Sequence, residues 1–175
     1  MTLRIPKRWL GPHWLRDVFY AIAYLSIFLR QRILPSRQPA ILILADSISR
    51  GRLPWLRQVF AGQYHVCGPF ENGQSTAFSL RRIGLWLSMR RRWVMVVCNW
   101  GLHDIRRNGG GPVAVPVEAY AANLRHLITR ICRRSDHCLF VTTTPVPPEA
   151  PLWHPADVER YNAAARAVMA ELGVP

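Results

Sequence analysis

Short apolar runs alternate along the chain with segments whose apolar residues recur every three or four positions. The runs at 41–45 and 93–98 are apolar throughout, which is typical of strands that are buried on both faces. Shorter segments at 63–67 and 138–142 predict two further strands. Because strands and helical stripes alternate, we predict an α/β fold in which helices flank a parallel sheet.

The helices of this fold are predicted from apolar positions that share one face. Such stripes predict helices over 53–60, 76–90, 117–134 and 156–172. The glycine-rich residues 108–112 predict a flexible loop, which we interpret as an insertion in preference to a lid over a substrate. The positions expected to face the core in the last three helices are Leu80, Ile83, Leu87, Val117, Tyr120, Leu124, Ile128, Ile131, Val158, Tyr161, Ala165, Val168 and Leu172.

Residues 1–39 follow a different pattern. An apolar run at 18–29 lies between cationic residues on both sides, and Trp9 and Trp14 precede it. The run is shorter than the ~20 residues that a membrane-spanning helix needs, and no small-residue signal-peptide cleavage site follows it. A helix on an anionic membrane surface fits this pattern, as does a helix packed on the domain, with a signal or mistranslated leader as a third interpretation. We expect a cytoplasmic or membrane-associated protein whose domain spans 40–175.

The composition is that of a single globular domain with a strongly positive charge. The 175 residues are half hydrophobic and include 23 Lys and Arg against 10 Asp and Glu, a formal net charge of +13. Such a charge attracts anionic partners, but no nucleic-acid-binding motif is present, so we do not expect a nucleic-acid partner. The four cysteines and the histidines lack metal-ligand spacing, so we expect free thiols and neither metal nor cofactor. The oligomeric state stays open.

Polar residues follow the predicted strands at three places. Asp46 and Ser47 come directly after the run at 41–45, Gly73 precedes a predicted helix, and the segment from Asn99 to Asp104 follows the run at 93–98. Ligands bind at the carboxyl ends of the strands in open α/β sheets, which makes Ser47 a candidate nucleophile. The alternative is that Asp46 and Ser47 only end the strand and cap the next helix.

These three segments resemble the motif blocks of the SGNH (GDSL-type) hydrolases, a family of serine esterases and lipases. Ala45-Asp46-Ser47 is similar to the Gly-Asp-Ser block, with Ala in place of Gly, and Gly73 is similar to the lone glycine block. Gly101-Leu102-His103-Asp104 is similar to a variant of the Gly-x-Asn-Asp block. The resemblance covers residues 40–175. It implies a three-layer flavodoxin-like fold and hydrolysis of a carboxylic ester or O-acetyl group, in a small molecule or a glycan.

The resemblance also implies roles for individual residues. Ser47 would attack the acyl carbon, while the backbone N–H groups of Ser47 and Gly73 and the side chain of His103 would form the oxyanion hole. Histidine stands where the family usually has Asn, and a neutral imidazole still donates one N–H, which makes this role pH-dependent. Asn99 is a second possible donor. Asp46 and Asp104 would support the site, and the alternative for His103 and Asp104 is a loop pair that fixes a turn.

The family's last block, Asp-x-x-His, supplies the general base, and it is absent from this sequence. His154 is a weak substitute, because the family's base lies one strand later. We therefore interpret the domain as truncated before that block, and we expect weak or no activity, since a serine nucleophile without its base loses most of its rate. The alternative function is a non-catalytic ligand-binding or membrane-surface protein with the same fold.

Overall fold

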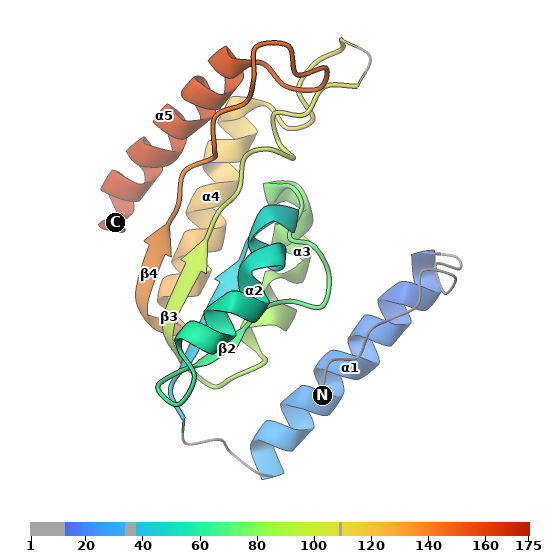
Figure 1. Cartoon of the computed structure of the whole chain (residues 1–175), viewed down its shortest axis with the longest axis vertical. Helices are drawn as coiled ribbons and strands as arrows, with labels where there is room; N and C mark the ends of the chain where they lie inside the picture. Colours follow the sequence, from blue (N-terminus) through green and yellow to red (C-terminus); the bar gives the residue numbers. More distant parts are fainter. Residues whose placement is uncertain (1–12, 34–37, 109) are drawn as a thin grey trace.

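The computed structural model describes residues 13–33, 38–108 and 110–175, and it places a parallel sheet between helices (Figure 1). The predicted α/β class is confirmed, with the strands in the order β2-β1-β3-β4. In chain order the elements are α1 (His13–Ile33), β1 (Ala40–Leu44), α2 (Ser47–Val59), β2 (His65–Cys67), α3 (Thr76–Leu87), β3 (Trp93–Cys98), α4 (Val117–Cys132), β4 (Ser135–Phe140) and α5 (Pro155–Leu172).

All pairs of neighbouring strands are parallel, so their carboxyl ends lie at one edge of the sheet. Leu44 at the end of β1 pairs with Cys98 at the end of β3, and Cys98 pairs with Phe140 at the end of β4. The backbone continues this alignment beyond the strands, because Asn99 donates to the Leu44 carbonyl at 3.0 Å. The segments after β1, β3 and β4 therefore meet at that edge.

The two faces of the sheet are covered to different extents. Leu42, Leu44 and Val96 point into a core that α3, α4 and α5 close on one side. Alternate residues such as Ile43 point to the other face, where α2 lies. Beyond α2, toward β4, this second face is partly open, and Val141 is 47% exposed there.

The predicted strand and helix boundaries are wrong at several places. The fourth strand is β4, which begins at Ser135, three residues before the predicted start. Residues 135–137 are polar, and β4 is an edge strand that exposes Asp136 and His137, so its sequence shows no continuous apolar run. The helix α3 ends at Leu87, before the predicted end at residue 90, and Ser88 caps it.

The amino-terminal helix α1 contacts the rest of the protein through one face. Tyr20 and Tyr24 are buried, and the Tyr24 hydroxyl donates to the Glu71 carboxylate at 2.8 Å and accepts from the Phe70 N–H at 3.0 Å. Asp17 forms an ion pair with Arg82 of α3. Among the described helices, α1 included, none has the length and apolar character to cross a bilayer.

Candidate active site

Ser47 is the first residue of α2 and lies three residues after Leu44, which ends β1. The chain leaves the sheet through Ala45 and Asp46, which are both buried, whereas Ser47 is exposed to solvent. The first turn of a helix presents unpaired backbone N–H groups and the positive end of the helix dipole. An anion that forms at Ser47 would therefore lie in a favourable field.

Gly73 lies against the backbone of Ala45. Its N–H donates to the Ala45 carbonyl at 3.2 Å, and a Cβ at Gly73 would stand 2.8 Å from that oxygen. The position therefore requires glycine for close approach. Because the N–H already has an acceptor, a role in an oxyanion hole requires that this hydrogen bond be shared or broken.

The carboxylate of Asp104 is buried and holds the start of α3. It accepts hydrogen bonds from the Thr76 backbone N–H at 3.0 and 3.2 Å and from the Thr76 hydroxyl at 2.5 Å, and Asn123 donates to the same hydroxyl at 3.0 Å. Burial raises the pKa of Asp104 to about 6, although the hydrogen bonds from Thr76 favour its charged form. Asp104 therefore ties the segment after β3 to the helix that follows Gly73.

A second buried connection joins the same two segments. The Ser79 hydroxyl donates to the Gly73 carbonyl at 2.8 Å and accepts from the Trp100 indole N–H at 2.7 Å. Next to Trp100, Gly101 has a φ of +155°, and a Cβ there would lie 1.9 Å from the Thr143 hydroxyl oxygen. The turn after β3 can therefore form only with glycine at this position.

His103 is half-buried beside Asp46 at this edge of the sheet. Burial lowers the pKa of His103 below its usual 6.5, the Asp46 carboxylate opposes that shift, and Arg106 adds to it. The imidazole is therefore mostly neutral at pH 7, with one N–H donor and one acceptor nitrogen. This protonation state is compatible with either an oxyanion donor or a general base.

The other two polar candidates lie after β3 and before α5. Asn99 donates one N–H of its side-chain amide to the Val141 carbonyl at 2.8 Å, which links the ends of β3 and β4. His154 is exposed and precedes the first turn of α5. Its neighbour Trp153 donates to the Leu102 carbonyl at 2.8 Å, so the loop that carries His154 returns to the turn that carries His103.

An apolar groove of about 430 Å³ leads away from this edge along the open face of the sheet. One end has polar residues, among them Asp46, Asn99 and Thr142. Farther along, the sheet face, α2 and the turn after it supply mainly apolar side chains, including Leu56 of α2 and Phe60 of the turn. The groove could accept an apolar group larger than acetyl. Among the described residues, no cluster of histidines, cysteines and acids could hold a metal ion.

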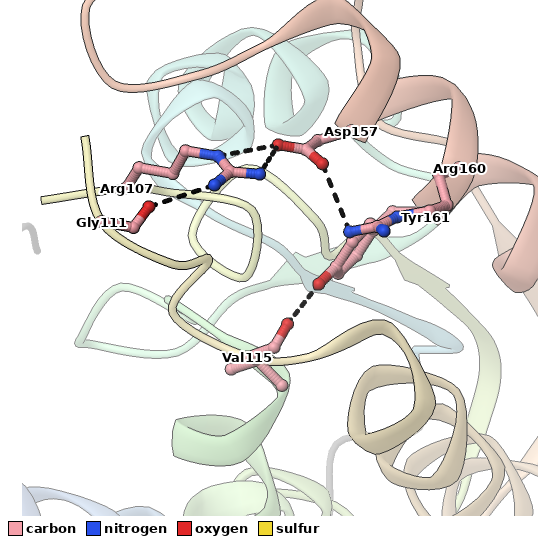
Figure 2. Close-up of polar contacts among 6 residues, drawn as sticks. All are labelled: Arg107, Gly111, Val115, Asp157, Arg160 and Tyr161. Carbon is pink, nitrogen blue, oxygen red and sulfur yellow. Dashed lines mark hydrogen bonds and ion pairs between the residues drawn. The ribbon is translucent and has the colours of Figure 1, made fainter.

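The glycine-rich loop after the site is anchored to α5 (Figure 2). The Arg107 guanidinium donates to Asp157 at 2.8 and 3.0 Å and to the Gly111 carbonyl at 3.1 Å. On the same helix, Arg160 lies 3.3 Å from Asp157, and the Tyr161 hydroxyl donates to the Val115 carbonyl. Both ends of this loop are therefore held by the first turns of α5.

Most of the buried polar partners were not predicted from the sequence. Thr76 and Ser79 in the first turn of α3 and Glu71 in the loop before it hold the segments around Gly73 in place. Single Thr, Ser and Glu residues have no specific spacing that would predict this role. The only available signal was their position beside the glycine block. The structure does bring Ser47, Gly73 and the turn around His103 to one edge of the sheet.

No protein-family model and no curated protein sequence matches the chain, but solved structures share its fold. The lipase/acylhydrolase from Enterococcus faecalis superposes with a TM-score of 0.64 and 17% sequence identity, over 79% of this chain and 74% of that one. The acetyl xylan esterase AlAXEase gives 0.66 and 12%, over 77% and 74%. AlinE4, an SGNH-hydrolase family esterase, gives 0.61 and 16%, over 79% and 75%. The chain therefore has the α/β fold of these hydrolases.

Proposed function

We propose that this protein is a serine ester hydrolase of the SGNH type that acts through Ser47. The observation that carries the proposal is the exposed Ser47 at the start of α2. It lies at the edge of the sheet where Gly73 and the turn that carries His103 are also found. The shared fold of the solved lipases and esterases supports the same reaction class. Substrates would be carboxylic esters or O-acetyl groups of small molecules or glycans.

The reaction would proceed by acyl transfer in two steps. The Ser47 oxygen attacks the carbonyl carbon, its proton passes to a base, and the alcohol leaves with a proton, which forms an acyl-enzyme. Water then attacks the acyl-enzyme and releases the acid and free Ser47. Backbone N–H groups at Ser47 and Gly73 and the imidazole N–H of His103 would stabilise the negative oxygen.

The general base is the open part of this mechanism. The sequence has no Asp-x-x-His pair, and we expect slow hydrolysis for that reason. Two histidines lie on segments that border the site. Burial lowers the pKa of His103, and the nearby Asp46 carboxylate opposes that shift, whereas His154 is exposed. Substituting each histidine in turn tests which of them acts as the base.

His103→Asn distinguishes an oxyanion donor from a base. Asparagine keeps an N–H donor but cannot accept a proton at neutral pH, so the rate is retained if His103 stabilises the oxyanion and falls to that of Ser47→Ala if His103 is the base. The rate of p-nitrophenyl acetate hydrolysis is measured for both variants, His103→Asn and Ser47→Ala. His154→Ala in the same assay tests the second histidine.

The direct test of the proposal is covalent labelling of Ser47. A fluorophosphonate probe should modify the wild-type chain at Ser47, and Ser47→Ala should lose the label. Ser26→Ala is the matched control, because Ser26 is also an exposed serine and lies on α1. Equal labelling of the wild type and Ser47→Ala, located by peptide mass spectrometry at other residues, contradicts the proposal.

A non-catalytic ligand-binding protein is the second candidate, and the Gly73 N–H favours it, because this group already donates to the Ala45 carbonyl and is not free to bind an oxyanion. This function predicts that short-chain esters bind without turnover. Calorimetry with an unhydrolysed ester, combined with no label at Ser47, would support it over the esterase.

A further inference from the structure

The helix α1 has two apolar faces, and only one of them is covered. Tyr20 and Tyr24 form the buried face, which packs against the segment around Glu71. Large apolar side chains on the opposite face are 41–60% exposed. We call this set the outer ridge: Leu15, Val18, Phe19, Ile22, Leu25 and Leu29.

The outer ridge is a continuous stripe along the helix. Leu15, Val18, Ile22, Leu25 and Leu29 are spaced by three and four residues in alternation, so their side chains share one face. From the first to the last of them the helix rises by ~21 Å. The ridge is therefore long enough to lie along a surface, and α1 does not have the length and apolar character needed to cross a bilayer.

Polar contacts on the other side fix the rotation of α1. The Tyr24 hydroxyl bonds to the Glu71 carboxylate, and Asp17 pairs with Arg82. Rotating the helix to bury the outer ridge would expose Tyr24 and leave Glu71 with one fewer donor. The exposure of the ridge is therefore built into the packing of the helix.

The positive charge of residues 1–39 indicates which kind of partner the outer ridge binds. Asp17 is the only acidic residue among residues 1–39, and it is already paired, whereas three cations lie at 4–8 and three more at 30–37. The whole chain carries +13, so two copies repel each other. An anionic lipid surface complements this charge and also accepts apolar side chains at the boundary of its headgroups.

We infer that α1 is an interfacial membrane-binding helix, which lies parallel to an anionic bilayer with its outer ridge inserted at the headgroup level. The positive charges at 4–8 and 30–37 of the sequence would attract the lipid phosphates, and the buried face would hold the α/β domain against the surface. This inference is independent of any reaction at Ser47.

Vesicle sedimentation of the full chain tests the inference. Vesicles with 30% phosphatidylglycerol in phosphatidylcholine should bind the wild type, and pure phosphatidylcholine should bind it far more weakly. The double variant Ile22→Gln and Leu25→Gln keeps the net charge and should bind anionic vesicles at least about tenfold more weakly, because apolar area drives insertion.

A matched control uses exposed apolar residues on another helix. Trp55 and Val59 of α2 are 61% and 49% exposed, and Trp55→Gln with Val59→Gln should leave vesicle binding unchanged. Thermal melting checks that both double variants fold. A second ridge pair, Val18→Gln and Leu29→Gln, replaces the first if that variant melts early.

Two outcomes overturn the inference. Equal binding by the ridge variant and the α2 control would show that net charge alone attracts the protein to lipid. A wild-type dimer in light scattering that the ridge variant converts to a monomer, with vesicle binding unchanged, would assign the ridge to a second copy of this chain.

Discussion

Asp104 and Ser47 both lie at the edge of the sheet where the strands β1 and β3 end, but their surroundings differ. Asp104 is fully buried and is bonded to Thr76, whereas Ser47 is exposed. The buried half of the site, which consists of Gly73, Thr76, Ser79, Trp100 and Asp104, is part of the folded core. The other half consists of Ser47, which is exposed, and of Asn99 and His103, which are half-buried. The first half should determine stability, and the second should determine reactivity.

The largest effect on stability is expected for Asp104→Ala. The substitution leaves the buried Thr76 N–H and hydroxyl without their acceptor, and it opens a cavity, which together cost about 3–4 kcal/mol. Chemical denaturation at pH 5 measures this loss. The control is Asp136→Ala, which removes an exposed ion pair with Arg92 and should cost less than about 1 kcal/mol. Equal costs for the two variants would remove the distinction between the halves.

The pH dependence of stability provides the next test. Burial raises the pKa of Asp104 from 3.8 to about 6, so the folded state holds this proton more tightly than the unfolded state. Stability due to this group is therefore full below about pH 4 and declines as the pH rises through 6, by at most about 3 kcal/mol. Asp104→Asn should lack this decline. If the stability of the variant and of the wild type declined with pH in parallel, the decline could not be due to Asp104.

Gly73→Ala should have a somewhat smaller effect on stability. The new methyl group would stand 2.8 Å from the Ala45 carbonyl oxygen, which is backbone and cannot rotate away, at a cost of about 2 kcal/mol. Gly51→Ala is the control, because a Cβ at Gly51 in α2 meets no atom within 4 Å. A helical glycine replaced by alanine should stabilise the protein slightly. Urea melts of the two variants measure the difference.

The smallest effect on stability is expected for Ser47→Ala, although it should remove any esterase activity. An exposed hydroxyl contributes little to folding, so the free energy of unfolding should change by less than about 0.5 kcal/mol. The same urea melt, combined with an ester-hydrolysis assay, measures both properties. A loss of about 1 kcal/mol or more would instead favour the helix-capping role of Ser47.

The sequence predicted an element best where its apolar pattern matches its burial in the fold. The strand β3 has the predicted bounds, because Trp93–Cys98 is apolar throughout and is buried in the centre of the sheet. The edge strand β4 was misplaced, because its first three residues are polar. Of the core positions predicted in α3, Ile83 and Leu87 are buried, but Leu80 is only half-buried, and Trp86 was missed.

For the candidate site, the sequence predicted which segments meet, but it did not predict how they are held. Parallel strands bring their carboxyl ends together, so the positions of Ser47 and the His103 turn follow from the strand pattern. The Ser79 bridge between Gly73 and Trp100 depends on side chains that are distant in sequence, and no local pattern encodes such a contact. The chemical roles of these residues stay predictions.

Glu71 gives α1 a mechanical connection to the candidate site. Its two carboxylate oxygens accept from the Tyr24 hydroxyl of α1 and from the Trp86 indole of α3, each at 2.8 Å, and it lies two residues before Gly73. A force that displaces α1 therefore pulls on the same short segment that sets the position of Gly73. A displacement of the amino-terminal helix would reach the segment before Gly73 through the Glu71 carboxylate and through the Phe70 N–H, which is bonded to the same Tyr24 hydroxyl.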